Sequence, residues 1–267
     1  MKEVKLLTAK NKANVEINSH IQMPKLLLKR FHNKNNKFFY YDVKGNFIGT
    51  NGTAESTNTK LGYYSIEIEN YFRDNIETPL GNFLALIEQN GFKTQTLGLP
   101  SNFSDIAKNF MRALVARSPS FLEQMKSEES VLINLPETKQ HDLVAKIGIN
   151  IANEHEIFSD YIVTFMINDT NIPFVLSVDG IYNYTLNGHS VINLPISPKA
   201  AISLIHESYV ERVLYQDGAV AMFVINEIDK IKLMNYCSFS SQIKQKFGRI
   251  ICPERAELER LKAEFNR

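Results

Sequence analysis

The spacing of apolar residues changes twice along the chain, and each change predicts a change of secondary structure. Near the N-terminus a short aromatic run, 37–43, is typical of a β-strand. Residues 44–46 then predict a tight turn into a second strand at 47–49. Residues 1–18 are polar and show no period, so we expect an irregular basic N-terminal arm ahead of a β-hairpin.

A helical period follows in the middle of the chain. Between Ile66 and Ile87 apolar residues recur at spacings near three and four, which predicts one buried helix face. Pro79 interrupts this pattern, so we expect the helix to start afresh near Thr78. The acidic residues of the segment fall mostly on its outer face: Glu67, Glu69, Asp74 and Glu88. Ser104 is a candidate N-cap for a helix over 105–117, which we expect to resume over 121–125 as a further helix. Thr138 is a candidate capping residue for a third helix that runs to Ile151.

Beyond Phe158 the apolar runs become short, β-branched and aromatic. They predict an antiparallel sheet of four strands, 160–167, 172–176, 190–194 and 200–205. A helix at 219–235, a strand at 248–252 and a charged helix at 253–265 complete the prediction. Segregated runs of strands and helices favour an α+β class over a doubly wound parallel sheet. We therefore expect residues 19–267 to form a single α+β domain, with central helices and C-terminal helices around the antiparallel sheet.

Composition argues against several classes of protein. The 267 residues are 44% hydrophobic and 22% charged, which is typical of a globular protein and not of a fibre. Two cysteines, Cys237 and Cys252, are too few for a disulfide-rich secreted scaffold or a zinc site made of cysteines alone. The start of the chain lacks an apolar signal segment, and the apolar run 161–167 is shorter than the roughly twenty residues that span a bilayer. We expect a cytoplasmic protein with no membrane partner.

The opening of the chain is distinctive. His20-Ile-Gln-Met-Pro24 precedes Leu28, Phe31 and an aromatic strand that ends at Asp42. Three later stretches accompany it in order. They are Ile76-Glu77-Thr78 within a helical run, Met111 to Phe121 with Arg117-Ser118-Pro119 at a helix end, and Pro173 to Asp179 followed by Leu194 to Lys199.

Together these stretches resemble the DUF4238 family, a bacterial domain of unknown function, over about residues 20–205. The chain departs from the family pattern at Val178, which separates Ser177 from Asp179, and at Gly180-Ile181, where the family has an Asn-Pro turn. The resemblance implies four candidate catalytic residues at the matching polar positions: His20, Glu77, Arg117 and Asp179.

These four residue types support proton transfer and charge stabilisation. A histidine paired with a carboxylate acts as a general base, and Arg117 would stabilise negative charge on a phosphate or carbonyl oxygen. The alternative is structural, because a Glu–Arg pair between packed helices is often a buried bridge and a histidine before a turn often caps backbone groups. No helical His-x-x-x-His spacing occurs among the other histidines, so the sequence predicts no metal site and identifies no cofactor.

A basic and aromatic stretch from Lys25 to Tyr41 has the chemistry of a platform for single-stranded nucleic acid, on which bases stack on rings and cations hold phosphates. The alternative is an ordinary strand with one core face. The net charge of +1 gives the whole chain no general attraction to nucleic acid. The candidate contact residues are Lys25, Lys29, Arg30, Lys37 and Tyr40.

Two hypotheses of function follow. The chain has no P-loop, dinucleotide fingerprint or Gly-x-Ser-x-Gly motif, which argues against an ATPase, a Rossmann oxidoreductase and an α/β-hydrolase. The first hypothesis is a nuclease-like or phosphodiester-hydrolysing enzyme acting on nucleic acid or a nucleotide, as an effector in bacterial conflict or phage defence. The second is a non-catalytic recognition module for nucleic acid or a partner protein. Catalysis requires His20, Glu77 and Arg117 to meet at an open cleft, whereas a structural role has them paired and buried.

Overall fold

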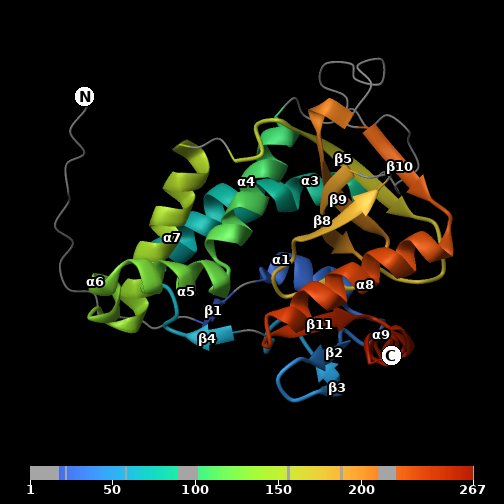
Figure 1. Cartoon of the computed structure of the whole chain (residues 1–267), viewed down its shortest axis with the longest axis horizontal. Coiled ribbons are helices and arrows are strands. Elements are labelled where there is room, and N and C mark those ends of the chain that lie inside the picture. Colours follow the sequence, from blue (N-terminus) through green and yellow to red (C-terminus); the bar gives the residue numbers. More distant parts are fainter. Residues whose placement is uncertain are drawn as a thin grey trace.

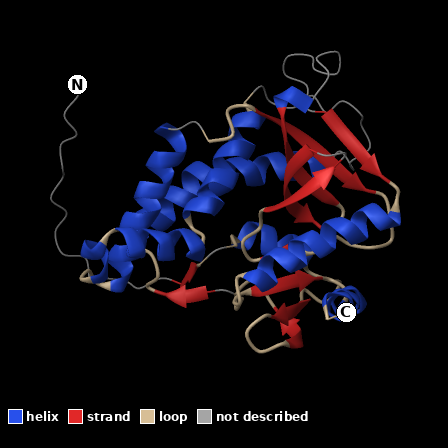
Figure 2. Ribbon diagram, viewed as in Figure 1, coloured by secondary structure: helices blue, strands red, loops and turns tan. Residues whose placement is uncertain are grey.

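Helices and strands occupy different parts of the molecule (Figures 1 and 2). Helices from the middle of the chain gather on one side, a five-stranded sheet lies on the other, and a four-stranded sheet and the C-terminal helix lie at one end. This arrangement confirms the predicted α+β class. The computed structural model describes residues 18–21, 23–57, 59–89, 102–154, 157–186, 189–209 and 221–266. The expected arm therefore lies outside the described residues, apart from Asn18.

The N-terminal hairpin is part of a larger sheet. Strands β2 (Phe38–Asp42) and β3 (Phe47–Gly52) pair antiparallel, which confirms the predicted hairpin. Strand β11 (Arg249–Cys252) pairs with β2, and β6 (Leu176–Ser177) pairs with β11, in the order β3-β2-β11-β6. A separate ladder joins β1 (Asn18–His20) to β4 (Thr59–Leu61), and a short helix α1 (Lys25–Leu28) continues into a 3₁₀ turn, η1 (Lys29–Phe31).

One long helical rod contains a π-helical turn. Helix α2 (Ile66–Tyr71) passes through the π turn η2 (Phe72–Glu77) into α3 (Thr78–Gln89) without a break, so the helix does not start afresh near Thr78 as expected. Proline lacks the N–H for a regular helical bond and crowds the carbonyl four residues earlier. In the wider turn the Thr78 N–H donates to the Arg73 carbonyl five residues back, so the rod continues past Pro79. This turn ends at Glu77.

Four further helices complete this side of the molecule: α4 (Phe103–Ala116), α5 (Pro119–Glu128), α6 (Ser130–Ile133) and α7 (Glu137–Glu154). The break between α4 and α5 follows from the sequence Arg117-Ser118-Pro119. Ser118 is extended and its hydroxyl accepts the Phe121 N–H at 3.3 Å, while Pro119 suits the first helical position because its missing N–H is not needed there. Arg117 therefore lies at the end of α4, next to the start of α5.

The larger sheet has the order β10-β5-β9-β8-β7. Its strands are β5 (Tyr161–Asn168), β7 (Tyr182–Leu186), β8 (His189–Ser197), β9 (Ala200–His206) and β10 (Ala221–Ile225). Pairing is antiparallel except between β10 and β5, which run parallel. Successive side chains point to opposite faces. Phe165 joins the main core, and its neighbour Met166 joins a second cluster on the face covered by α8 (Ile228–Lys244).

Two predictions about this half were wrong. The segment 172–176 is not a strand of this sheet: only Leu176 is in a strand, and β6 joins the smaller sheet. The predicted helix 219–235 is a strand over Ala221–Ile225, and the helix begins only at Ile228. Residues 219 and 220 lie outside the described residues. The apolar run Ala-Met-Phe-Val-Ile fits either structure, and pairing with β5 decides it.

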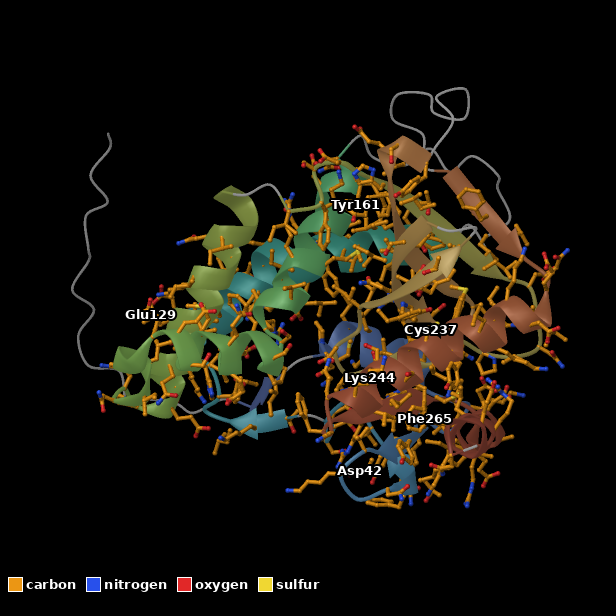
Figure 3. The ribbon with its side chains drawn as sticks, in the orientation of Figure 1. Asp42, Glu129, Tyr161, Cys237, Lys244 and Phe265 are labelled. Atoms are coloured by element: carbon orange, nitrogen blue, oxygen red, sulfur yellow. The ribbon has the colours of Figure 1, made fainter. Side chains whose placement is uncertain are left out.

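The C-terminal helix α9 (Arg255–Phe265) packs with α8 against the smaller sheet, and Figure 3 marks Phe265 at its end. The cluster between these elements includes Tyr41, Phe239 and Ile250, all buried. Within the described part of the chain, no helix has the length and apolar character needed to cross a bilayer.

Candidate functional site

The structure pairs two of the four candidate residues. Arg117 Nη1 donates to Glu77 Oε1 at 2.8 Å, which joins the end of α4 to the end of the π turn. The Arg117 side chain is only 2% exposed and that of Glu77 is 22% exposed. This contact therefore has the geometry of a buried bridge between helices.

Aromatic rings enclose the Arg117 guanidinium. Its Cζ lies 4.5 Å from the centre of the Phe72 ring and 5.7 Å from that of Tyr64. Burial by itself lowers the pKa of a guanidinium, but the negative charges of Glu77 and Glu69 and the Tyr64 hydroxyl outweigh it, so the pKa of Arg117 is raised. Arg117 is held as a cation inside the protein.

Glu69 belongs to the same cluster, contrary to its predicted place on the outer helix face. Burial raises the pKa of Glu69, and Arg117 together with a hydrogen bond from Ser19 offsets part of this effect. Ser19 is fully buried, and its hydroxyl also accepts the Tyr64 N–H at 3.3 Å. Strand β1 is thereby attached to the cluster around Arg117.

His20, the first candidate residue, ends this strand. Its backbone pairs with Thr59 of β4 and directly follows Ser19. The side chain of His20 lies outside the described residues, so its predicted role stays a prediction. The same holds for the side chain of His189 and for all of His155.

The turn after His20 reaches the fourth candidate segment. Gly180 follows Asp179 and has a φ of +73°, a conformation that favours glycine. A Cβ at Gly180 would lie 2.6 Å from Met23 Cε and 3.1 Å from Leu114 Cδ1. The segments around residues 20, 77, 117 and 179 are thus neighbours in the fold, although they are far apart in the sequence.

Asp179 lines an open cleft of about 250 Å³. Ser118 and Ser120, at the start of α5, form part of its wall. The remaining lining residues come from α4, the segment after Asp179 and the end of α8: Leu114, Val115, Ile181, Tyr182, Asn183, Ser241 and Gln245. Arg117, directly before Ser118 in the chain, supports this wall from the protein interior.

Burial raises the pKa of Asp179 to about 6, and a hydrogen bond with the Gln245 side chain offsets only part of that rise. The Asp179 backbone is fixed, since its N–H donates to Gln242 Oε1 at 3.4 Å and its carbonyl accepts the Ile181 N–H at 2.8 Å. A carboxyl group with this pKa exchanges protons near neutral pH, as a general acid or base requires.

Two side chains that line the cleft carry fully buried polar atoms with no hydrogen-bond partner among the described residues. These atoms are the Tyr182 hydroxyl and Gln245 Oε1. Complete burial raises the pKa of Tyr182 well above its ordinary value, so its hydroxyl remains a donor. An unpaired buried polar group costs about 1–3 kcal/mol. Both atoms lie beneath the surface of the cleft, so they would not contact a ligand without local movement.

The candidate nucleic-acid residues lie elsewhere, around α1 and the hairpin, and most already have partners. Lys25 pairs with Glu55 at 3.0 Å and Arg30 with Glu88 at 2.7 Å. Lys37 donates to Asn51 at 3.2 Å, whereas Lys29 is exposed. The ring of Tyr40 is covered by Arg249, whose Cζ lies 4.5 Å from the ring centre, and by Gly49. This ring does not offer two free faces to a base.

No family model, curated protein or solved structure matches this chain. The resemblance to the DUF4238 family therefore stays a prediction. Among the residues that the structure describes, no three His, Cys, Asp or Glu side chains gather in a way that would hold a metal ion.

Sequence reasoning missed several residues of the cluster and the cleft, chiefly Tyr64, Tyr182 and Gln245. Tyr64 and Tyr182 are ordinary aromatic residues in apolar runs, and no local pattern marks them. Gln245 lies 66 positions after Asp179, and only the packing of α8 brings the two together. Ser118 did carry a signal, because Ser-Pro after a helix predicts a cap for the next one.

Proposed function

We propose that this protein hydrolyses phosphodiester bonds and that the reaction takes place in the cleft at Asp179. The observation that carries the proposal is the Asp179 carboxyl group, whose pKa is raised to about 6 beside an open cleft. Perturbed carboxyl groups in clefts are typical of catalytic acids and bases. Above pH 6 this group is ionised, which suits a general base.

The start of α5 supports a phosphate at this cleft. Helix α5 has ten residues, and the N-terminus of a helix attracts anions through its free N–H groups and its dipole. Phe121 donates its N–H to the Ser118 hydroxyl and Pro119 has no N–H. The Ser118 and Ser120 hydroxyls share one hydrogen bond at 3.2 Å, so the Ser120 N–H and one of the two hydroxyl protons would remain to donate to a phosphate oxygen.

In the proposed reaction Asp179 takes a proton from a water molecule as the water oxygen attacks phosphorus. The new P–O bond forms while the bond to the leaving oxygen breaks. Asp179 then returns the proton to the leaving oxygen, so that one water molecule is consumed and the carboxylate is restored. Groups at the start of α5 stabilise the charge that develops on the non-bridging oxygens.

Glu77 and Arg117 are positioning residues in this proposal. Their buried bridge fixes the junction of α4 and α5, and thereby the position of Ser118 and Ser120. Arg117 does not contact the substrate, because its side chain is 2% exposed. The proposal does not depend on Lys25 or Arg30, which are already paired with acids.

The test is turnover of a chromogenic phosphodiester, bis(4-nitrophenyl) phosphate, and of a short single-stranded RNA. We expect kcat/KM to rise with pH through about 6 and Asp179→Asn to lower it by about 10²–10⁴-fold, the usual contribution of a general base. Asp169→Asn, a change of the same type at an exposed aspartate, serves as the matched control. Equal activity of Asp179→Asn and wild type would overturn the proposal.

A role in bacterial conflict or phage defence is tested by expression in a bacterial host. If hydrolysis of cellular RNA or nucleotides is the activity, wild type slows growth and Asp179→Asn does not. His20→Ala in the same assay tests whether the histidine takes part. Growth inhibition that persists in Asp179→Asn would separate toxicity from this cleft.

The second candidate is a non-catalytic module that binds a nucleotide in the same cleft. The observation in its favour is the lining, in which hydroxyl and amide groups of Ser118, Asn183 and Gln245 surround a single carboxyl group. Such a module binds the same ligands without turnover. Measurable equilibrium binding of AMP to wild type, together with no turnover of bis(4-nitrophenyl) phosphate or RNA, would favour the module, whereas turnover that is lost in Asp179→Asn would exclude it as the whole function.

A further inference from the structure

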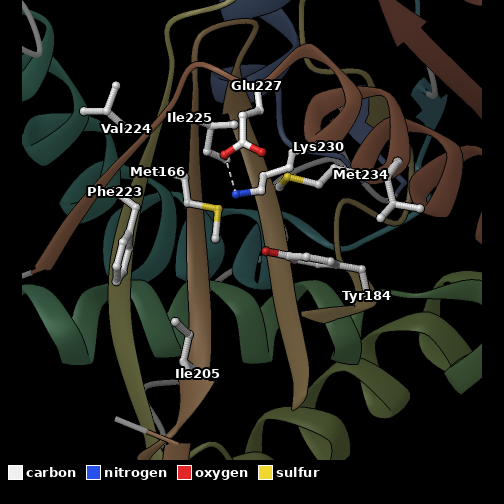
Figure 4. A pocket seen from close by; sticks show the side chains of 10 residues that line it. Met166, Tyr184, Ile205, Phe223, Val224, Ile225, Glu227, Lys230 and Met234 are labelled. Atoms are coloured by element: carbon white, nitrogen blue, oxygen red, sulfur yellow. Dashed lines mark hydrogen bonds and ion pairs between the residues drawn. The ribbon is translucent and has the colours of Figure 1, made fainter. Parts of the chain in front are cut away.

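A second cavity lies between α8 and one face of the five-stranded sheet (Figure 4). Its volume is about 180 Å³. Strands β5, β7, β9 and β10 supply one wall through Met166, Tyr184, Ile205 and Ile225, and α8 supplies the other through Met234. A face of the sheet and a helix thus enclose a defined space rather than a flat surface.

The walls and the size of this cavity suit a small apolar body. Met166 and Met234 are 3% and 2% exposed, and methionine side chains adapt to ligands of irregular shape. An engineered apolar cavity of about 150 Å³ holds one benzene ring. A cavity of about 180 Å³ therefore has room for one ring and a short substituent.

The mouth of the cavity is apolar as well. Phe223 on β10 is 42% exposed and Leu233 on α8 is 52% exposed, and both line the cavity. Exposed apolar side chains that gather in one place often mark a binding site. An apolar molecule entering here would cover surface that water now contacts.

Two hydrogen-bond donors and one carboxylate, that of Glu227, face the cavity. Figure 4 shows the Tyr184 hydroxyl and the Lys230 ammonium both turned toward the space beside Met166. Burial raises the pKa of Tyr184 to about 12, so this hydroxyl stays protonated, and the contacts of the described residues include no partner for it. Lys230 pairs with Glu227 at 2.6 Å, and an ammonium group has three N–H donors. The pair is half exposed, at 50% and 60%, so Lys230 reorients at little cost.

We propose that this cavity binds a small monocarboxylic acid whose apolar body is about the size of one aromatic ring. The ring would lie among the methionines and Phe223. The carboxylate would accept hydrogen bonds from the Tyr184 hydroxyl and the Lys230 ammonium. This inference is independent of the proposed hydrolase activity, because the two sites share no lining residue.

The test uses phenylacetate as the probe. The comparison ligands are 2-phenylethanol and 2-phenylethylamine, which have the same phenyl ring and two-carbon chain but carry a hydroxyl or an ammonium group in place of the carboxylate. Binding is followed by calorimetry and by NMR of methyl-labelled methionines. We expect phenylacetate to bind more tightly than the alcohol by about tenfold, to bind more tightly still than the amine, and to shift the Met166 and Met234 methyl signals. Equal affinity for acid and amine, or binding that leaves both methyl signals unmoved, would overturn the proposal.

Two conservative variants sharpen the test. Lys230→Gln should weaken phenylacetate binding by about tenfold while leaving 2-phenylethanol unchanged, and Tyr184→Phe should weaken both ligands. The matched control is Lys232→Gln, because Lys232 also pairs with an acid three residues earlier on α8, Asp229 at 3.5 Å, but does not line the cavity. An equal loss in Lys230→Gln and Lys232→Gln would show that general charge, and not this site, attracts the acid.

Discussion

Two ionisable groups, buried Arg117 and partly buried Asp179, lie near the same cleft, and their surroundings shift the charge of each in opposite directions. Arg117 has a carboxylate partner at 2.8 Å and aromatic rings around it, and its pKa is shifted in the direction that keeps it charged. The Asp179 carboxyl has the Gln245 side chain as a hydrogen-bonding neighbour, and burial shifts its pKa in the direction that disfavours its charge. One group stabilises the fold as an ion, whereas the other is destabilised as an ion.

This difference in pKa shift distinguishes two of the polar residues that the family resemblance singled out, Arg117 and Asp179. A buried cation that is paired and enclosed has what a structural bridge requires. A carboxyl group whose ionised form is disfavoured beside an open cleft lowers stability at neutral pH, and such a group is typical of a functional site. From this comparison we propose that the Glu77–Arg117 bridge belongs to the scaffold and that Asp179 takes part in the chemistry. Stability measurements on each group test this assignment without knowledge of a substrate.

The largest effect is expected from breaking the bridge on one side. Glu77→Gln leaves the Arg117 cation buried with its nearest negative charge removed, which typically costs about 3–5 kcal/mol. Because Glu77 is 22% exposed, we expect about 3 kcal/mol, the lower end. The free energy of unfolding from urea titration at pH 7 measures it.

Two control variants show whether the burial of the charge is the cause. Asp229→Asn breaks an exposed ion pair on α8, in which Asp229 is 96% exposed, and should change stability by less than about 0.5 kcal/mol. The double variant Glu77→Leu with Arg117→Met removes both charges and should recover most of the loss. If Glu77→Gln were as stable as wild type, the bridge would not be part of the scaffold.

A smaller effect of opposite sign is expected at Asp179. Its pKa is about 6 in the folded protein against an ordinary value of 3.8, so the folded state holds the proton more tightly than the unfolded chain does. Tighter proton binding by Asp179 therefore stabilises the folded state fully below about pH 4, and this stabilisation is lost as the pH rises through 6. One pKa unit corresponds to about 1.4 kcal/mol, so this difference corresponds to about 3 kcal/mol. Because Asp179 is partly exposed and solvent screens it, we expect Asp179→Asn to be more stable than wild type by about 2 kcal/mol at pH 8.

The same variant should show no such gain at pH 4, where the carboxyl group is protonated in the folded state. Urea midpoints of wild type and Asp179→Asn between pH 4 and pH 8 measure the difference. A constant difference across this range would mean that Asp179 does not titrate as proposed. A gain in stability together with a loss of turnover would be the signature of a functional group.

Local patterns predicted the parts of this fold that depend on local chemistry. The hairpin at 38–52 and the break at Ser118-Pro119 each follow from a few adjacent residues. These features required no knowledge of long-range contacts.

Other features depend on partners that a local pattern does not contain. The sequence pattern predicted a helix where the structure has strand β10, and pairing with β5 decides for the strand. Glu69 was expected on the outer face, but the π turn adds a residue to one turn of the rod and shifts the helix face. The cleft joins α4, the Asp179 turn and α8, so its shape follows from packing alone.

The smallest effect is expected from a substitution at Gln245. It changes the surroundings of Asp179, and thereby its pKa, while the carboxyl group itself stays in place. The Gln245 side chain hydrogen-bonds the Asp179 carboxyl group and lowers its pKa. Gln245→Leu removes this bond, so the pKa of Asp179 should rise further above 6, by less than about one unit because a hydrogen bond of this kind contributes about 1 kcal/mol. The carboxyl ¹³C shift of Asp179 in NMR titrations of both proteins measures the change. Gln140→Leu on α7 is the control, because the Gln140 side chain donates to the Leu135 carbonyl at 2.7 Å and has no contact with Asp179 among the described residues. If the pKa fell in Gln245→Leu, desolvation would not be the main cause of the shift, and the low stability of the Asp179 ion would need another origin.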